Sequence, residues 1–198
     1  MNIDPTAPSH LLSMATLHPD VERVLLDEET IAKRVRELGE EIARDYRGRA
    51  PVLVGILKGS VPFLADLLRA LRLDCSVDFM SAASYAGESS TGVVRLLLDL
   101  RESVQGMDVL LVEDIVDTGL TLSYLQQNLK TRKPASLEIC TLLDKPGCRK
   151  VRVKPRYTGF KIPNEFVVGY GLDYNEKYRN LPYVAVLKPS AVTQGASG

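Results

Sequence analysis

The sequence has no excess of charge of either sign. Its 198 residues include 25 Lys plus Arg and 25 Asp plus Glu, so the formal net charge is zero. A protein that collects nucleic acid or anionic membrane by bulk charge needs a basic field, and this chain provides none. Any anion site must therefore be local, and we expect neither a nucleic-acid partner nor a membrane partner.

Paired cysteines and long apolar runs are missing as well. Cys75, Cys140 and Cys148 are odd in number and form no CxxC pair, which argues against a disulfide framework or a thiolate zinc site. No stretch approaches the ~18 apolar residues of a membrane span. Residues 1–20 contain no basic segment followed by an apolar one, so no secretory leader is indicated. We therefore expect a cytoplasmic protein.

The composition is otherwise that of a folded globular protein. Hydrophobic residues make up 45% of the chain and charged residues 25%, which argues against long disordered regions. A chain of this length fits one domain with room for a small additional lobe. We expect residues 1–19 and 190–198 to be weakly ordered termini.

Short apolar runs, separated by polar or glycine-containing loops, occupy the middle of the chain. They are continuous rather than alternating, which is typical of strands covered on both faces. The runs are Val52 to Leu57, Leu73 to Met80, Val93 to Leu100, Val109 to Val112, and Leu137 to Leu143. Each is therefore expected to form a strand.

Helical patterns lie before and between these runs. Asp27 is placed to cap a helix whose apolar residues recur at three- and four-residue steps. Those residues are Ile31, Val35, Leu38 and Ile42. Ser60 and Pro62 open a second expected helix that continues to Leu71, and Thr121 to Lys130 is expected to form a third.

This order of elements predicts an α/β fold over residues 20–144, with a largely parallel, twisted sheet flanked by helices. The pattern of residues changes after Lys145, where short β-like segments are interrupted by Pro146, Pro155, Pro163, Pro182 and Pro189. We expect residues 145–189 to form a small C-terminal lobe without helices.

Polar residues follow three of the predicted strands. They are Lys58 and Gly59, then Glu113 and Asp114 with Asp117 to Gly119, and finally Asp144 and Lys145. Ligands of open α/β sheets bind beyond the carboxyl ends of the strands. The three groups are therefore expected to meet at one edge of the sheet.

The central group has the chemistry of a sugar-phosphate site. Adjacent acids such as Glu113 and Asp114 suit a diol, which they bind through paired hydrogen bonds, or a hard cation such as Mg²⁺. The Asp117–Gly119 loop leads into a helix, where backbone amides and hydroxyls bind phosphate. For a lone Asp-Thr-Gly, a capped turn with solvated acids is the commoner interpretation, but the longer string from Val109 to Thr121 favours a functional site.

The string VLLVEDIVDTGLTL, Val109 to Leu122, resembles the phosphoribosyl-pyrophosphate signature of the type I phosphoribosyltransferases. Four further blocks resemble the hypoxanthine-guanine branch of that family. They are LKGS from Leu57, SYAGESSTG from Ser84, DKP from Asp144, and IPNEFVVGYGLDYNEKYRNLPYVAVL from Ile162. The resemblance implies a type I phosphoribosyltransferase-like core with a C-terminal hood. It also implies transfer of a 5-phosphoribosyl group to N9 of hypoxanthine or guanine, with release of pyrophosphate.

The resemblance also implies residue roles at the sugar-phosphate end of the site. Glu113 and Asp114 match contacts to the ribose hydroxyls and the metal, and Asp117 matches a general base that removes a purine ring proton. The phosphate cradle corresponds to Thr118, Gly119 and Thr121. The pyrophosphate contacts correspond to Lys58, Gly59 and Arg179, with a cis peptide expected between Leu57 and Lys58.

At the purine end, the resemblance implies that Lys145 donates to O6, that Phe166 stacks on the base, and that the Val167 backbone meets its Watson-Crick edge. Taken alone, Lys145 could be a turn lysine, and Phe166 a core residue. Asp173 matches a metal ligand, so Mg²⁺ is the expected cofactor. Ser84 and Tyr85 match a mobile loop, and a homodimer or homotetramer is expected.

Two alternatives stay open at this point. A phosphoribosyltransferase for xanthine or a pyrimidine would share the central loop but not Lys145 with Phe166. A nucleotide-sensing RNA-binding regulator would use a basic surface, for which the candidates are Arg149, Lys150, Arg152, Lys154 and Arg156. Because charge runs without interleaved aromatics are usually solvated, the enzyme is favoured. Glu165 beside the base pocket leaves the choice between guanine and hypoxanthine open.

Overall fold

The computed structural model describes residues 17–84 and 94–193. The elements in chain order are β1 Val21–Leu26, α1 Glu28–Asp45, β2 Val52–Ile56, α2 Val61–Ala70, β3 Ser76–Ser84, β4 Val94–Leu98, β5 Asp108–Val116, α3 Leu120–Lys130, β6 Ser136–Asp144, the short 3-10 helix Pro146–Cys148, β7 Tyr157–Lys161, β8 Val167–Val168, β9 Val184–Leu187 and α4 Pro189–Thr193. None of the helices in these residues is long and apolar enough to cross a membrane.

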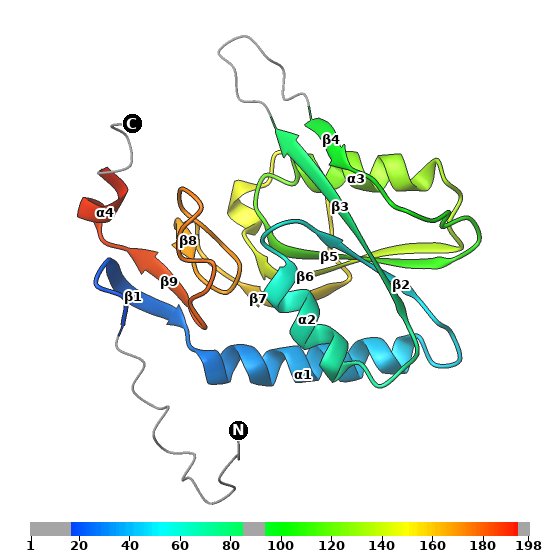
Figure 1. Ribbon diagram of the computed structural model, residues 1–198, viewed down its shortest axis with the longest axis horizontal. Helices are drawn as coiled ribbons and strands as arrows, with labels where there is room; N and C mark the ends of the chain where they lie inside the picture. Colours follow the sequence, from blue (N-terminus) through cyan, green and yellow to red (C-terminus); the bar gives the residue numbers. More distant parts are fainter. Residues whose placement is uncertain (1–16, 85–93, 194–198) are drawn as a thin grey trace, which may run out of the picture.

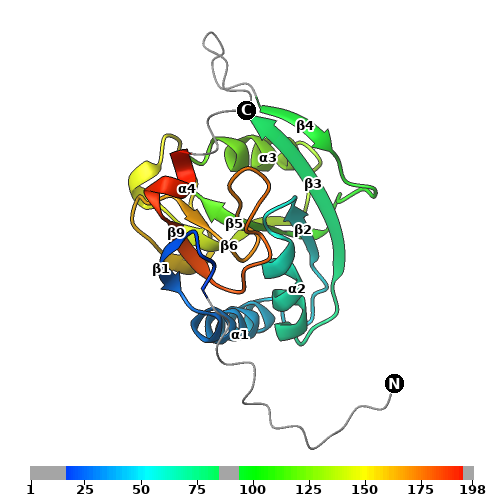
Figure 2. The same ribbon diagram turned by 60° about the vertical axis from the view of Figure 1, so that its left-hand side comes forward.

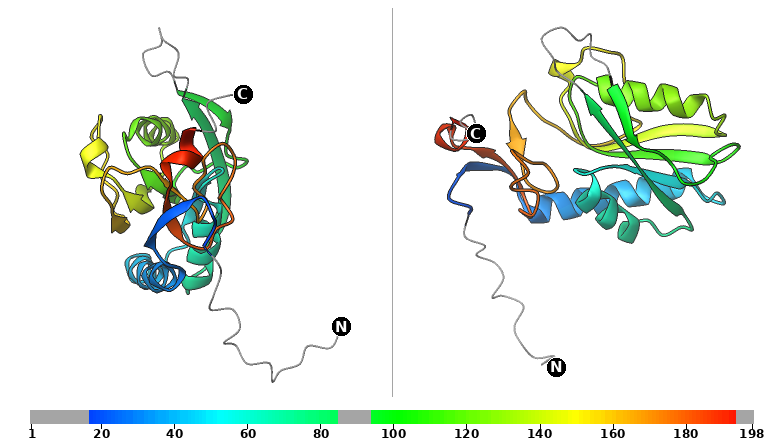
Figure 3. Two further views of the ribbon diagram at one scale, coloured as in Figure 1. Left: turned by 90° about the vertical axis from the view of Figure 1, so that its left-hand side faces the viewer. Right: turned by 45° about the horizontal axis from the view of Figure 1, so that its top comes forward.

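A six-stranded sheet in the order β4-β3-β2-β5-β6-β7 forms the centre of the molecule (Figure 1). Its strands pair in parallel, except for β4, which runs antiparallel to β3. Helices α1 and α2 lie on one side of the sheet and α3 lies on the other (Figures 1 and 3). The predicted α/β fold with a largely parallel sheet is confirmed.

Successive residues of the central strands pack against opposite helices, as the alternation of side chains along a strand requires. Leu53 and Leu110 pack in the cluster with α1 and α2. Val54 and Leu111 pack in the cluster with α3. All five residues of β2 are buried, which explains why the strand is continuously apolar in sequence.

Helix α1 begins at the expected cap, where the Asp27 carboxylate accepts a hydrogen bond from the Thr30 amide at 2.7 Å. Its predicted apolar face is buried in full. A Cβ on Gly39 would lie 2.7 Å from Cβ of Ala70, so α1 and α2 pack with almost no space between their backbones.

A second, three-stranded sheet in the order β1-β9-β8 forms a small lobe at one end of the large sheet (Figures 1 and 2). The expected boundary between core and lobe, after residue 144, is wrong for two strands. β1 comes from the expected core but pairs with β9, and β7 comes from the expected lobe but pairs with β6. Helix α4, Pro189–Thr193, includes residues 190–193 of the expected weak tail. Residues 1–16 and 194–198, for which weak order is expected, lie outside the described residues.

Candidate active site

The carboxyl ends of three neighbouring strands meet at one edge of the large sheet. β2, β5 and β6 are adjacent and parallel, so the residues that follow them lie close together. The register pairs Val116 with Asp144, and the Lys145 amide donates to the Val116 carbonyl at 2.9 Å. The prediction that these strand ends share an edge is confirmed.

A cavity of about 180 Å³ lies at this edge, between the ends of β2 and β5 and the start of α3. The residues expected to contact a phosphorylated ribose line it together with the expected base: Glu113, Asp114, Asp117, Thr118, Gly119 and Thr121. β5 continues through both acids to Val116 rather than ending at Val112, so the acids are held on a strand instead of a loop.

The start of α3 gives this cavity the features of an anion site. Gly119 precedes the helix with φ 79° and ψ 0°, a left-handed conformation that glycine adopts without strain. The Asp117 carboxylate accepts a hydrogen bond from the Thr118 amide. The first-turn amides of a helix have no partner inside it and lie at its positive end. The helix start is therefore suited to phosphate.

The two acids of the cavity are held in an unusual electrostatic state. Burial, and then the neighbouring Asp114 carboxylate, raise the pKa of Glu113 well above its usual range. Burial also raises the pKa of Asp114. Within the described residues, Glu113 Oε2 is buried without a hydrogen-bond partner. A ligand that brings hydroxyl donors or a cation would relieve both conditions.

A second cavity of about 260 Å³ adjoins the first and extends toward the small lobe. Its lining residues are Asp114, Ile115, Asp117, Lys145, Phe166, Val167, Leu172 and Asp173. Three of these, Asp114, Ile115 and Asp117, also line the first cavity. The two cavities therefore form one cleft, and Asp117 lies where they join.

The side chains of the second cavity suit a flat base with a polar edge. Lys145 is only 8% exposed, whereas the Phe166 residue is 54% exposed. The interpretation of Phe166 as a core residue is therefore wrong. Its ring meets the Tyr174 ring edge to face, with centroids 5.6 Å apart. Val167 is buried in β8 and pairs with Val186, so its backbone is fixed by the small sheet.

A network of ion pairs joins the pyrophosphate-loop lysine to the small lobe. Lys58 Nζ lies 3.1 Å from Glu176 Oε2. Arg179 Nη2 lies 2.9 Å from Asp173 Oδ1 and 3.3 Å from Glu176 Oε1. Arg179 Nε is buried without a partner in the described residues. Glu176 therefore holds two expected pyrophosphate contacts, and nothing in the sequence pattern pointed to it.

Two glycines make a close contact between the large sheet and the small lobe. A Cβ on Gly59 would lie 1.6 Å from Asp114 Oδ2, and a Cβ on Gly171 would lie 1.9 Å from the Gly59 carbonyl oxygen. The peptide bond between Leu57 and Lys58 is cis, as the resemblance implies. The loop after β2 therefore lies directly between an acid of β5 and the backbone of the lobe.

The acidic residues near the cleft suit a metal that is shared with a ligand. In residues 17–84 and 94–193, no group of three His, Cys, Asp or Glu side chains is placed to hold a metal ion. Mg²⁺ is usually bound through one or two carboxylates, and substrate oxygens and water complete its coordination. Asp114 and Asp173 both line the second cavity, which fits that arrangement.

Ser84 of the expected mobile loop is the last residue of β3, but Tyr85 of that loop lies outside the described residues.

The sequence placed Arg149 only in a basic stretch, yet it forms a nearly buried ion pair with Asp144. Ion pairing is not visible in sequence because the two residues lie on either side of a turn.

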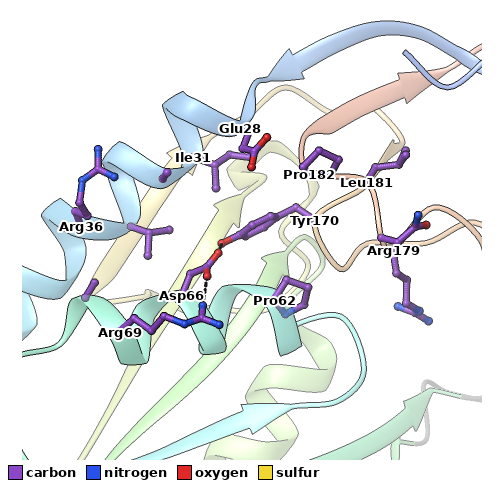
Figure 4. Close-up of a pocket in the computed structure, with 14 residues that line it drawn as sticks. Glu28, Ile31, Arg36, Pro62, Asp66, Arg69, Tyr170, Arg179, Leu181 and Pro182 are labelled. Carbon is purple, nitrogen blue, oxygen red and sulfur yellow. Dashed lines mark hydrogen bonds and ion pairs between the residues drawn. The ribbon is translucent and has the colours of Figure 1, made fainter. Parts of the chain in front are cut away.

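A larger cavity of about 640 Å³ lies elsewhere, between α1, α2 and the small lobe (Figure 4). The Tyr170 hydroxyl reaches into it and donates to Asp66 at 2.7 Å, and Arg69 pairs with the same carboxylate. Of the residues with expected site roles that the structure describes, Arg179 alone lines it. Most residues with expected site roles therefore line the smaller cleft, whereas Lys58, Gly59 and Arg179 are not among the residues that line it.

The chain is similar to known proteins over most of its length. Residues 23–175 match the family model of the phosphoribosyl transferase domain. A hypoxanthine-guanine phosphoribosyltransferase from Lactococcus lactis is 54% identical, and the match covers 85% of this chain and 92% of that protein. A crystal structure of a hypoxanthine phosphoribosyltransferase from Staphylococcus aureus is 51% identical with a TM-score of 0.84, covering 87% of this chain and 94% of that one.

Some relatives are much longer than this chain. The bifunctional protein TilS/HprT of Listeria innocua is 49% identical over 180 residues. That match covers 90% of this chain but only 28% of the Listeria protein. The similarity to the bifunctional protein therefore concerns one part of it alone.

Proposed function

Because this chain belongs to the hypoxanthine-guanine phosphoribosyltransferases of the type I family, we propose that it salvages 6-oxopurines. The reaction transfers the 5-phosphoribosyl group of 5-phosphoribosyl-1-pyrophosphate to N9 of hypoxanthine or guanine and yields IMP or GMP with pyrophosphate. The observation that carries the proposal is the joined cleft. One half has a helix start and paired acids, and the other has a buried lysine and an exposed aromatic ring.

In this proposal the first cavity binds the sugar phosphate. The backbone of Thr118 and Gly119, with the Thr121 hydroxyl, binds the 5-phosphate, where the helix dipole favours its charge. Glu113 and Asp114 accept hydrogen bonds from the ribose hydroxyls. Those hydroxyls supply the donors that the buried Glu113 carboxyl lacks.

The second cavity binds the purine. Phe166 stacks on the ring, the Val167 backbone meets the Watson-Crick edge, and Lys145 donates to O6. Adenine carries an amino group at this position, which leaves the buried lysine without an acceptor. Such a mismatch discriminates by about 10⁴-fold or more. The selection of 6-oxopurines therefore rests mainly on Lys145.

The chemistry takes place where the two cavities join. Asp117 lies at that junction and serves as the general base, accepting a purine ring proton as N9 bonds to C1 of the ribose. General-base catalysis of this kind contributes typically 10²–10⁴-fold. On the pyrophosphate side, Lys58, the Gly59 backbone and Arg179 stabilise the negative charge that grows as pyrophosphate leaves.

We propose Mg²⁺ as the cofactor, held by Asp173 with Glu113 and Asp114 nearby and completed by substrate oxygens. When bound, the ion neutralises charge on the leaving pyrophosphate. Arg179 pairs with Asp173 in this structure. In the proposed reaction Arg179 therefore releases the Asp173 carboxylate and turns its guanidinium toward pyrophosphate.

The mobile loop, the assembly and the location also remain proposals. Ser84 and Tyr85 would close over the cleft and exclude water from the ribosyl centre. Division into a core of residues 20–144 and a hood of residues 145–189 is retained for function, because the second half supplies Lys145, Phe166, Asp173 and Arg179. A homodimer or homotetramer is checked by light scattering of the purified protein, and a cytoplasmic location by fractionation.

The direct test is a substrate panel with the purified protein, Mg²⁺ and 5-phosphoribosyl-1-pyrophosphate. Hypoxanthine, guanine, xanthine, adenine and uracil are compared by kcat/KM. We expect turnover of hypoxanthine, guanine or both, and adenine weaker by about 10⁴-fold. A clear preference for xanthine, adenine or uracil would overturn the proposal.

A further inference from the structure

The loop that carries Asp117 is held from outside by the segment that follows β6. The Lys145 amide donates to the Val116 carbonyl at 2.9 Å, and the Lys150 amide donates to the Thr118 carbonyl at 2.9 Å. A Cβ on Gly119 would lie 3.2 Å from Cδ of Arg149. The segment therefore packs along the whole turn between β5 and α3.

Arg149 makes the only side-chain bridge of this contact that the described residues contain. Its Nη1 donates to the Asp117 carbonyl oxygen at 2.9 Å, and its Nη2 forms a close ion pair with the Asp144 carboxylate. One planar guanidinium thus holds the backbone of the proposed base and the end of β6 at the same time, which a single ammonium group does less well.

This ion pair is more protected from water than the other ion pairs of the described residues. The Arg149 and Asp144 side chains are 16% and 9% exposed. The pair of Arg156 with Asp45, by comparison, is 46% and 34% exposed. Removing two charges from water is costly, and a buried pair is weak evidence of a gain in stability. A role in fixing the site's geometry explains its placement better.

Asp144 extends the effect of the bridge to the purine half of the cleft. It immediately precedes Lys145, whose amide is bound to the same turn. A shift of the Arg149–Asp144 pair would therefore move the base at Asp117 and the O6 donor at Lys145 relative to each other. In the proposed reaction these two groups must reach the same purine.

We propose that Arg149 is a positioning residue for phosphoribosyl transfer. Through the Asp117 carbonyl it sets the direction of the base, and through Asp144 it keeps that base in register with Lys145. Arg149 itself does not line either half of the cleft. The inference rests on the proposed transferase activity, because it assigns Arg149 no role outside that reaction.

The test compares Arg149→Ala and Arg149→Lys with a matched control, Arg156→Ala. Arg156 also follows β6 and pairs with Asp45 and Glu138, but it is remote from the cleft. For Arg149→Ala we expect kcat to fall by about 30- to 100-fold, because displacing a catalytic group by ~1 Å has effects of that order. The KM for 5-phosphoribosyl-1-pyrophosphate should change by less than about threefold, since the Lys150 amide still holds the Thr118 carbonyl of the phosphate cradle at 2.9 Å.

Rescue separates positioning from general stabilisation. A low, non-denaturing concentration of guanidinium should restore kcat of Arg149→Ala at least about fivefold, by refilling the space between Asp117 and Asp144. It should not change wild type or Arg156→Ala. Arg149→Lys should lie between wild type and Arg149→Ala, because lysine can bind one of the two partners.

The outcomes are distinguishable. If wild type is active and the kcat of Arg149→Ala, per folded molecule, stays within about twofold of it, the inference is wrong. It is also wrong if kcat falls but neither guanidinium nor lysine restores any of it. Should Arg149→Ala fail to fold, Arg149→Lys decides alone, and wild-type kcat in that variant overturns the inference. A wild-type protein that is inactive with every purine overturns the proposed function instead.

Discussion

The two halves of the cleft are built in different ways. The half proposed to bind the sugar phosphate comes from one continuous segment, Glu113 to Leu122, together with the end of β2 and Ala82. The half proposed to bind the purine is assembled from side chains of separate segments, with Lys145 after β6 and Phe166 and Asp173 in the small lobe. In the proposed function, the first half binds with backbone and paired acids, and the second selects with individual side chains. A substitution should therefore affect the two substrates unequally, depending on which half it changes.

The largest effect is expected at the junction of the two halves. Asp117→Asn keeps the shape and the hydrogen bond to Thr118 but cannot accept a proton. We expect kcat to fall by about 10²- to 10⁴-fold with little change in the affinity for 5-phosphoribosyl-1-pyrophosphate. Steady-state kinetics and calorimetric binding measure the two quantities separately. Equal losses in both would contradict the assignment of Asp117 as base.

Lys145→Gln sharpens the comparison from the purine side. Glutamine can donate to O6 but carries no charge, so kcat/KM for hypoxanthine should fall by about 10- to 100-fold, as expected for a lost charge-assisted hydrogen bond. Discrimination against adenine should weaken, because the glutamine carbonyl can accept from its amino group. The control is Lys130→Gln at the exposed end of α3. An unchanged ratio of hypoxanthine to adenine would contradict the role of Lys145.

Phe166→Leu tests whether the aromatic ring acts on one substrate only. Base–aromatic stacking contributes about 1–3 kcal/mol, so KM for the purine should rise by about tenfold while the sugar-phosphate affinity stays unchanged. Tyr174→Phe is the matched variant, because it keeps the ring against Phe166 and removes only the hydroxyl bonded to the Val192 carbonyl at 2.6 Å. It should raise the purine KM less than Phe166→Leu does. Comparable effects on both substrates would contradict the proposal that each half of the cleft binds one substrate.

The smallest effect is one on stability, at Glu113. Its pKa is raised by burial and by Asp114, so the folded protein keeps a proton that the unfolded chain releases above about pH 4.5. The free energy of unfolding therefore falls as pH rises from about 4.5, the pKa of Glu113 in the unfolded chain, to its higher pKa in the folded protein. Glu113→Gln removes this loss, and the melting temperature of the ligand-free protein at pH 8 should rise by about 2–4 °C.

The control for the Glu113→Gln variant is pH itself. At about pH 4 the glutamate is protonated in both the folded and the unfolded chain, so the difference in melting temperature between variant and wild type should nearly vanish. Differential scanning fluorimetry across this range, with chelator present, measures it. An equal difference at both pH values would show that the effect does not come from the titration of Glu113.

Local sequence signals predicted the large sheet well because its burial pattern is local. The continuous run Val52 to Ile56 is a strand covered on both faces, and Asp27 caps α1 as expected. β1 could not be assigned in this way, because its partner β9 lies about 160 residues later in the chain. β7 lies within the expected lobe but pairs with β6, the strand that precedes it in the chain, so the large sheet extends past residue 144. Pairing between distant strands leaves no mark in either strand alone.

The site, like the sheet, was predictable where its signal lies within one continuous segment. The Glu113–Thr121 segment was recognised from its own residues, whereas the roles of Lys145 and Phe166 in binding a purine came only from the resemblance. The C-terminal end of β5 was predicted at Val112 instead of Val116, because two adjacent acids look like a loop. In the structure they stay on the strand, where Glu113 pairs with Thr141 of β6. Arg149 and Glu176 gave no usable signal, since each binds a residue on another segment, Asp117 and Lys58 respectively.

The contact between Gly59 and Gly171 has a consequence for mutational tolerance. Neither position has space for a single additional carbon, because each Cβ would meet an oxygen of another segment, at 1.6 Å and 1.9 Å. In a library of all single substitutions selected for purine salvage, both positions should therefore be depleted of every replacement, alanine included. Two residues with no side chain of their own would then be among the least variable in the protein.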